Sequence, residues 1–281
     1  MFGGSTTWGT GSRDEYTIPS QLSKILANKF GPKFEVVNYG EGGYVNTQEL
    51  ITFLKELERG NVPQIAIFYD GYNDVFSAFQ NGVAGIPQNE INRVREFSLT
   101  KSGPKFYKEF VLRSNLFLLF TQGVGWLRHV SNREHWSRAF ESRVSNTSSE
   151  LLIADLLKIY GNNTRVAQAV GREYNVRVFT FWQPSVYTKA ELVPSEKSAA
   201  AWDPIFGDFY AKTSKALEAS PVVKMESFYN LDGIFAEHPE MIFEDAVHIS
   251  ERGNEIVADR IASQITPAVT QILQAQQAQS R

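Results

Sequence analysis

Apolar residues recur along the chain in two alternating spacings. Where they recur every three or four residues, as on one face of a helix, the pattern predicts helices at 18–30, 47–59, 149–174 (one long helix or a kinked pair), 203–219 and 253–273. Short runs rich in β-branched and aromatic residues predict strands at 34–38, 64–69 and 176–182. Alternation of this kind predicts an α/β fold in which a parallel sheet is covered by helices on both faces.

Polar and glycine-rich loops follow the predicted strands. Three of them follow a strand directly or close a strand–helix unit, among them 39–44 (YGEGGY) and 70–74 (DGYND). In open parallel sheets, ligands bind beyond the carboxyl ends of the strands. We therefore expect these loops to converge on one shared site.

Two stretches depart from the regular pattern. Residues 76–148 are aromatic, basic and broken by Gly and Pro, with helical patches, which predicts a mainly helical insertion or cap over the core. Residues 274–281 form a polar Gln/Ala tail that we expect to fray. No internal repeat is visible, so we interpret 1–281 as a single domain that carries this insertion.

Composition excludes several classes of protein. Of 281 residues, 42% are hydrophobic, which is enough to bury a core. The 28 Lys and Arg against 31 Asp and Glu give a net charge of -3, which argues against a nucleic-acid partner. The absence of cysteine excludes disulfides, thiolate metal sites and cysteine nucleophiles. We expect no signal peptide and no spanning helix in this chain, since no apolar run approaches about 18 residues.

A few side chains have the chemistry of an acyl-transfer site. Asp245 precedes His248 by three residues, so in a helical turn the carboxylate can accept from Nδ1–H and leave Nε2 as a base. Ser5 lies in a Gly-flanked turn that leaves its hydroxyl accessible. Gly43 can present a backbone N–H, and Asn73 a side-chain amide, to a developing oxyanion. Taken singly, each of these residues is more typical of a turn or a helix cap.

Together these residues form four blocks in a fixed order. They are a serine in a Gly-rich first loop, N-x-G-x-x-G at 38–43, G-x-N-D at 71–74 and D-x-x-H at 245–248. In this order, and over most of the chain, they resemble the SGNH hydrolases, the GDSL esterase superfamily.

The resemblance implies a flavodoxin-like three-layer α/β/α sandwich, the SGNH hydrolase fold, with no cofactor and no metal. It implies that Ser5 is the nucleophile, His248 the base and Asp245 the partner of that base. The N–H groups of Ser5 and Gly43 and the side chain of Asn73 would form the oxyanion hole. The expected activity is hydrolysis of a carboxylic ester through an acyl-serine intermediate. The expected substrate is a small-molecule or polysaccharide ester, with an O-acyl ester of a carbohydrate favoured.

The chain departs from the family pattern at its start. Gly4 stands where the family motif G-D-S-L has Asp, and we expect this change to be tolerated because that Asp is not a member of the triad. The family also places a hydrophobic strand before the serine, whereas only four residues precede Ser5 here. We therefore expect a truncated first strand, completed by an upstream segment that could carry a signal or a membrane anchor. The compartment and the oligomeric state stay open.

Other interpretations remain at this point. Trp182 and Gln183 end a predicted strand at the expected site and are candidates for substrate binding, or for packing. An acyltransferase that passes the acyl group to a sugar hydroxyl would use the same residues, and a non-catalytic binding module could keep the fold. A metal-dependent hydrolase is a further alternative, although the spacing fits no standard signature; its candidate ligands are His238, Glu240, Glu244, Asp245 and His248.

Overall fold

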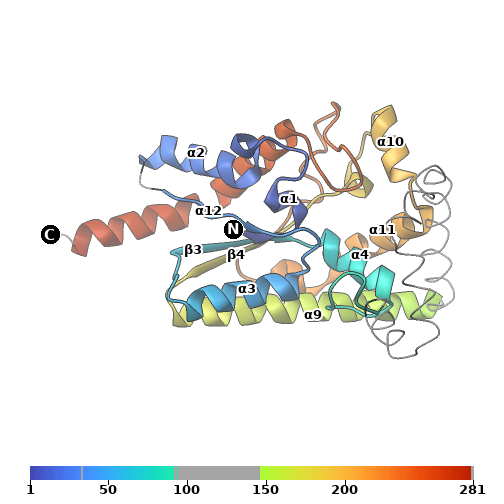
Figure 1. Ribbon diagram of the computed structural model, residues 1–281, viewed down its shortest axis with the longest axis horizontal. Coiled ribbons are helices and arrows are strands. Elements are labelled where there is room, and N and C mark those ends of the chain that lie inside the picture. Colours follow the sequence, from blue (N-terminus) through green and yellow to red (C-terminus); the bar gives the residue numbers. More distant parts are fainter. Residues whose placement is uncertain (33, 92, 94–145, 280–281) are drawn as a thin grey trace, which may run out of the picture.

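The computed structural model describes residues 1–32, 34–91, 93 and 146–279. A parallel sheet lies at its centre (Figure 1). The sheet has five strands in the order β2-β1-β3-β4-β5. The strands are β1 (Phe2–Gly3), β2 (Tyr39–Gly40), β3 (Ile65–Asp70), β4 (Arg177–Trp182) and β5 (Phe228–Asn230). The predicted α/β class, with a central parallel sheet, is confirmed.

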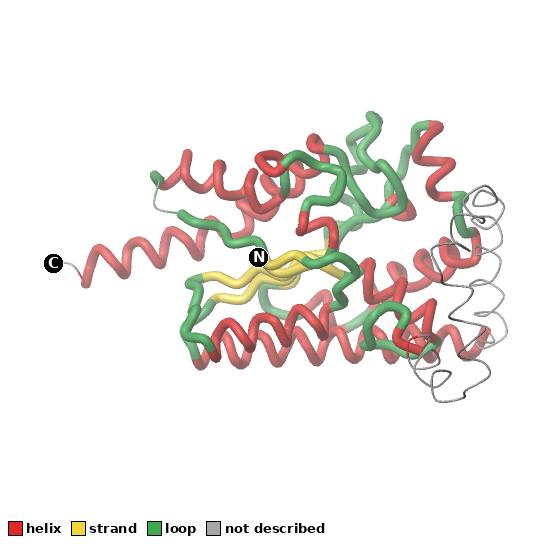
Figure 2. Tube along the Cα trace, viewed as in Figure 1, coloured by secondary structure: helices red, strands yellow, loops and turns green. Residues whose placement is uncertain are grey.

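Helices cover both sides of the sheet and complete the three layers (Figure 2). One outer layer contains α2 (Ile18–Phe30) and α12 (Glu251–Gln279), which pack against each other. The other contains α3 (Asn46–Glu58), α4 (Tyr72–Asn81), α9 (Asn146–Glu173) and α11 (Pro204–Ala219). The short helices are α1 (Ser5–Trp8), α10 (Pro194–Ala200), and the 3₁₀ turns η1 (Asp14–Tyr16), η2 (Val186–Thr188) and η3 (Pro221–Lys224).

The central strand β3 shows why the sheet is buried on both faces. Its alternate side chains Ile67 and Tyr69 belong to the apolar cluster under α2 and α12, while Ala66 and Phe68 belong to the cluster under α3 and α9. In a strand that is buried on both faces, no alternate position faces solvent and needs a polar side chain, which explains the continuous apolar sequence of β3.

The predicted strand at 34–38 is wrong, because these residues form no ladder with another strand. Phe34 and Val36 pack on the core, and the Val37 carbonyl accepts from the Met1 amino group at 2.7 Å. Pairing with β1 begins only at the next two residues, which form β2. β1 itself is two residues long, yet it lies between β2 and β3, so this short strand is inside the sheet and not at its edge.

The irregular regions also differ from expectation. The insertion predicted at 76–148 begins later, because α4 continues through its first six residues with Phe79 buried. Residues 92 and 94–145 of that insertion lie outside the described residues. Helix α9 is one continuous helix, and α12 runs on through residues 274–279, where we expected fraying. Among the described residues, no helix combines the length and apolarity that crossing a membrane requires.

Candidate active site

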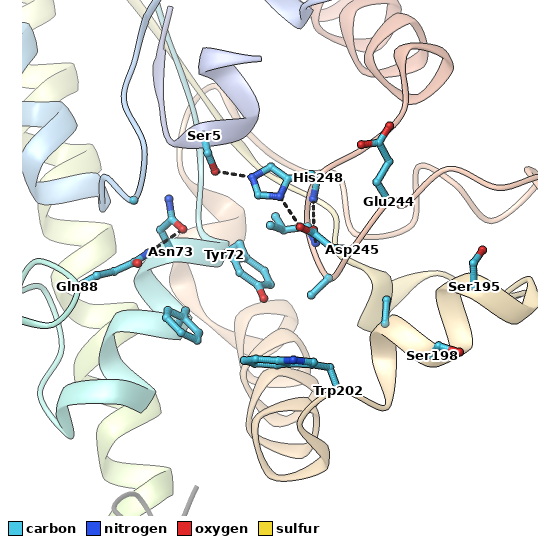
Figure 3. Close-up of a pocket in the computed structure, with 15 residues that line it drawn as sticks. Ser5, Tyr72, Asn73, Gln88, Ser195, Ser198, Trp202, Glu244, Asp245 and His248 are labelled. Carbon is cyan, nitrogen blue, oxygen red and sulfur yellow. Dashed lines mark hydrogen bonds and ion pairs between the residues drawn. The ribbon is translucent and has the colours of Figure 1, made fainter. Parts of the chain in front are cut away.

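A cavity of about 650 Å³ opens beside the loops that follow β1, β2 and β3 (Figure 3). Ser5 begins α1 after β1, Gly43 lies in the loop after β2, and Asn73 lies in the first turn of α4 after β3, so the predicted convergence at the carboxyl edge of the sheet is confirmed. The other lining residues come from α4 and the segment after it, from α10 and the turn after it, and from the loop before α12: Tyr72, Phe76, Gln88, Ser195, Ser198, Ala199, Trp202, Glu244, Asp245, Ala246, Val247 and His248.

A chain of hydrogen bonds joins three predicted site residues on one wall of the cavity. The Nε2 atom of His248 lies 2.8 Å from the Ser5 Oγ atom, and its Nδ1 atom lies 2.6 Å from Asp245 Oδ2. Figure 3 shows the imidazole standing between the hydroxyl and the carboxylate. With the proton on Nδ1, held by Asp245, Nε2 is free to accept the proton of Ser5.

Helix α1 presents Ser5 directly after β1. The carbonyl oxygens of Thr7 and Trp8, near the end of this one-turn helix, accept from the Asn38 side chain at 3.0 and 3.3 Å. Gly40 lies so close that a Cβ there would come within 2.3 Å of the Trp8 nitrogen. Because Ser5 opens the helix, its backbone N–H is among the donors that have no partner inside the helix.

A short loop holds Asp245 and His248 in their relative orientation. An isolated bridge between Phe243 and Ile249 closes this loop. Asp245 Oδ1 accepts from the backbone N–H groups of Val247 and His248, both at 2.8 Å. Partial burial by itself would raise the pKa of Asp245, but these bonds and the imidazole outweigh it and hold the pKa below its usual value. The carboxylate therefore stays ionised beside the imidazole.

A buried ion pair fixes the segment that leads into this loop. Glu196 on α10 accepts from the backbone N–H groups of Ile242 and Phe243, both at 2.9 Å, and from Lys189 Nζ at 2.7 Å. Both charged side chains are fully buried. The pair joins α10, which forms one wall of the cavity, to the chain just before Asp245.

Asn73 is placed by an unusual turn at the end of β3. Gly71 has a φ of 115°, and a Cβ there would lie 2.7 Å from the Trp182 ring, so only glycine fits. The Asn73 amide donates to the Tyr44 carbonyl at 2.8 Å, and a Cβ on Gly4 would lie 2.2 Å from Asn73 Nδ2. The amide thus lies against the backbone just before the nucleophile candidate.

Buried carboxyl groups connect the loops behind Asn73. Asp74 accepts from the backbone N–H of Asn46, the first residue of α3, with both oxygens at 3.1 and 3.2 Å. The Asn46 side chain in turn donates to Asp70 at 2.8 Å. Burial raises the pKa of Asp74 and of Glu49, which also face the charge of Asp70. These bonds tie α4 to the start of α3, and so fix Asn73 relative to the loop of Gly43.

Trp182 and Gln183 do not line the cavity, which corrects the prediction that they bind substrate. They are 0% and 2% exposed, and Trp182 packs edge-to-face on Tyr160 in the core. The tryptophan of the cavity is instead Trp202, at 45% exposure. Sequence analysis missed it, and missed Gln88, because both follow the ends of helices where no periodic pattern marks a position.

The ligands proposed for a metal are not gathered. His238 pairs with Glu240 at 3.1 Å and borders a different cavity from that of His248. Within the described ranges, no group of three or more His, Asp or Glu side chains is arranged to hold a metal ion.

A parallel α/β sheet with serine, imidazole and carboxylate hydrogen-bonded beyond its carboxyl edge is typical of enzymes that hydrolyse esters. The family model of the GDSL-like lipases/acylhydrolases matches residues 1–261. The chain belongs to this family and is a hydrolase of ester bonds; a triad and an oxyanion hole are typical of the family. The predicted resemblance to GDSL esterases is confirmed.

Several solved structures are similar to the chain at low sequence identity, and no curated protein matches the chain. The acetyl xylan esterase AlAXEase is 12% identical, with 94% of this chain and 98% of that chain covered and a TM-score of 0.48. A catalytic mutant of the acetylxylan esterase Axe2 from Geobacillus stearothermophilus is 13% identical, with 94% and 92% covered and a TM-score of 0.47. A GDSL-like lipase from Bacteroides thetaiotaomicron is 12% identical, with 95% and 86% covered and a TM-score of 0.43.

Proposed function

We propose that the protein is a serine esterase that cleaves a carboxylic ester through an acyl-serine intermediate. The observation that carries the proposal is the hydrogen-bonded series from Ser5 through His248 to Asp245, which faces a cavity large enough for a small ester. A serine hydroxyl is activated when a base lies within hydrogen-bond reach of it and a third group orients that base.

The reaction proceeds in two halves. His248 takes the hydroxyl proton of Ser5 while the Ser5 Oγ atom bonds to the ester carbonyl carbon. His248 then gives that proton to the leaving alkoxide as the ester C–O bond breaks. Water attacks the acyl-serine, His248 takes a proton from it, and the Ser5–acyl bond breaks as that proton returns to Ser5 Oγ. The products are an alcohol and a carboxylic acid.

Three donors stabilise the oxyanion in each half. They are the backbone N–H groups of Ser5 and Gly43 and the Asn73 Nδ2 group, and all three residues line the same cavity. An Asn amide nitrogen carries two hydrogens, and the bond to Tyr44 uses one of them. The second is available to the oxyanion, where a donor of this kind contributes ~10²–10³ in rate.

The walls of the cavity suit an O-acyl ester of a carbohydrate. Tyr72 and Phe76 form an aromatic side, α10 contributes Ser195 and Ser198 to the lining, and Trp202 adds a half-exposed indole. Mainly apolar walls with a few polar groups are the usual composition of small-ligand sites. A hydroxyl-rich ring can pack on the aromatic groups and hydrogen-bond to the serines.

Kinetics on two substrates test the proposal. The wild-type protein should hydrolyse p-nitrophenyl acetate and release acetate from an O-acetylated oligosaccharide. Ser5→Ala and His248→Ala should each lose both activities, and Ser263→Ala, a change at an exposed position on α12, should keep them. Full activity in Ser5→Ala would refute the proposed nucleophile, and transfer of acetate to an added sugar without release of acid would show a transferase instead.

A further inference from the structure

Gln88 is hydrogen-bonded to Asn73 and lies close to Gly43, the two oxyanion donor residues outside α1. Its Nε2 atom donates to Asn73 Oδ1 at 3.0 Å (Figure 3), and its Oε1 atom lies 3.4 Å from the place where a Cβ on Gly43 would be. The side chain lines the cavity and is partly buried. No motif of the sequence marks this position.

The contact with Gln88 decides which way the Asn73 amide faces. A carbonyl oxygen can only accept, so the Tyr44 carbonyl holds the NH₂ end of Asn73 on its own side. Gln88 donates to the other end, and so holds the oxygen of Asn73 away from the place where the oxyanion forms. Both bonds select the same one of the two amide orientations.

We infer that Gln88 is a positioning residue, which keeps the NH₂ group of Asn73 aimed at the oxyanion. This inference rests on the proposed function, because it assigns Gln88 an effect only through the oxyanion donor. Within the described part of the chain, loss of Gln88 would leave the Asn73 amide with the bond to Tyr44 alone. Rotation about the last torsion of Asn73 would then exchange its donor NH₂ group for its acceptor oxygen.

The backbone around Gln88 is fastened to the helix that carries Asn73. Ser77 donates to the Ile86 carbonyl at 2.6 Å, and the Asn81 amide donates to the Pro87 carbonyl at 3.2 Å. Both donors lie on α4, which also includes Asn73. One rigid element therefore sets the separation between the two amides, so a change of the Gln88 side chain need not move Asn73 through the backbone.

Two substitutions separate positioning from packing. Gln88→Met keeps the length of the side chain and removes its donor, so kcat should fall by about two- to tenfold, the effect of one neutral hydrogen bond. Gln88→Glu places an acceptor opposite Asn73 Oδ1, and the Asn73 amide should turn its NH₂ group to the new carboxylate. We expect kcat to fall by ~10²–10³, as for loss of the donor itself, with KM unchanged.

A double-mutant cycle with Asn73→Ala tests the inference. When Asn73 has no amide left to orient, Gln88→Met and Gln88→Glu should leave kcat unchanged. Equal losses in both backgrounds, an unchanged kcat for Gln88→Glu in the wild-type background, or a higher KM with unchanged kcat would each overturn the inference. Ser5→Ala separates it from the proposed function: if Ser5→Ala is active, the function fails and the inference with it; if it is inactive, the cycle judges Gln88 alone.

Discussion

Replacing Gly4 with Ala should damage catalysis while leaving the fold intact. Gly4 has φ -84° and ψ -153°, an extended conformation that alanine also adopts. The added Cβ, however, would lie 2.2 Å from Asn73 Nδ2, whereas ordinary contact begins at 3.4 Å. Nδ2 is the end of a flexible side chain, so it will retreat by about 1.2 Å, the difference between those two distances.

That retreat gives the magnitude of the effect. Misplacing a reacting group by about 1 Å costs ~10² in rate, and complete loss of an oxyanion donor costs ~10²–10³. We therefore expect kcat to fall by about 10², which is ~2.7 kcal/mol in activation free energy. The unfolding free energy should change by less than ~1 kcal/mol, because the entropy that alanine removes from the unfolded chain offsets a weakened bond between Asn73 and Tyr44.

The assay is steady-state hydrolysis of p-nitrophenyl acetate together with urea unfolding. KM should stay unchanged, since the oxyanion contact forms only in the transition state. Gly42→Ala is the matched control, because apart from its two chain neighbours no described residue has an atom within 4 Å of the Cβ it would add. A kcat for Gly4→Ala within a factor of three of the control, or a loss of several kcal/mol in stability, would refute the reasoning.

Three further outcomes follow from the structure. Lys189→Met leaves the buried Glu196 without its cation and should lower the free energy of unfolding, measured in urea, by ~3–5 kcal/mol. Lys212→Met, which removes an exposed ion pair, should lower it by less than ~1 kcal/mol. Equal losses in the two variants would contradict the role of burial. Asp245→Asn should lower kcat by ~10⁴ with the fold kept, as measured by hydrolysis and circular dichroism, and a near-normal kcat would exclude Asp245 as the partner of the base. In the chain that starts at Met1, burial lowers the pKa of the amino group from 8.0 to about 5. The unfolded chain then binds more protons between those pH values, so the unfolding free energy should rise with pH from about 5 to 8. Acetylation of the amino group should flatten this rise, and the same slope with and without acetylation would contradict the shift.

The candidate site was largely predictable because most of its residues lie just after strands whose ends must meet. Ser5, Gly43 and Asn73 each follow a strand of one parallel sheet, so the topology brings them to one edge whatever the details of packing. His248 and Asp245 are close in sequence, and a short loop is enough to pair them. Gln88 was not predictable, since its contact with Asn73 depends on how the chain turns back after α4.

Trp182 shows the limit of inference from strand ends. The sequence places it at the carboxyl end of β4, the edge where ligands bind, but not on which side of the sheet its ring turns. The ring turns into the core and fills the space that Gly71 leaves empty. It shapes the site through that turn and does not line the cavity.

The strand prediction at 34–38 failed for a different reason. The alternation of Phe34 and Val36 with polar or exposed neighbours is real, and both residues pack on the core. A strand also needs a neighbour with which to pair, and β1 pairs only through Phe2 and Gly3. Local pattern predicts an extended backbone, while the length of the ladder depends on a distant segment.

Covalent labelling tests the central claim most directly. A fluorophosphonate should add to the wild-type protein at one site per chain, and digestion followed by mass spectrometry should map the adduct to Ser5. Labelling should be absent in Ser5→Ala and complete in Ser263→Ala. An adduct that persists in Ser5→Ala, or that maps to another residue of the wild-type protein, would contradict the account.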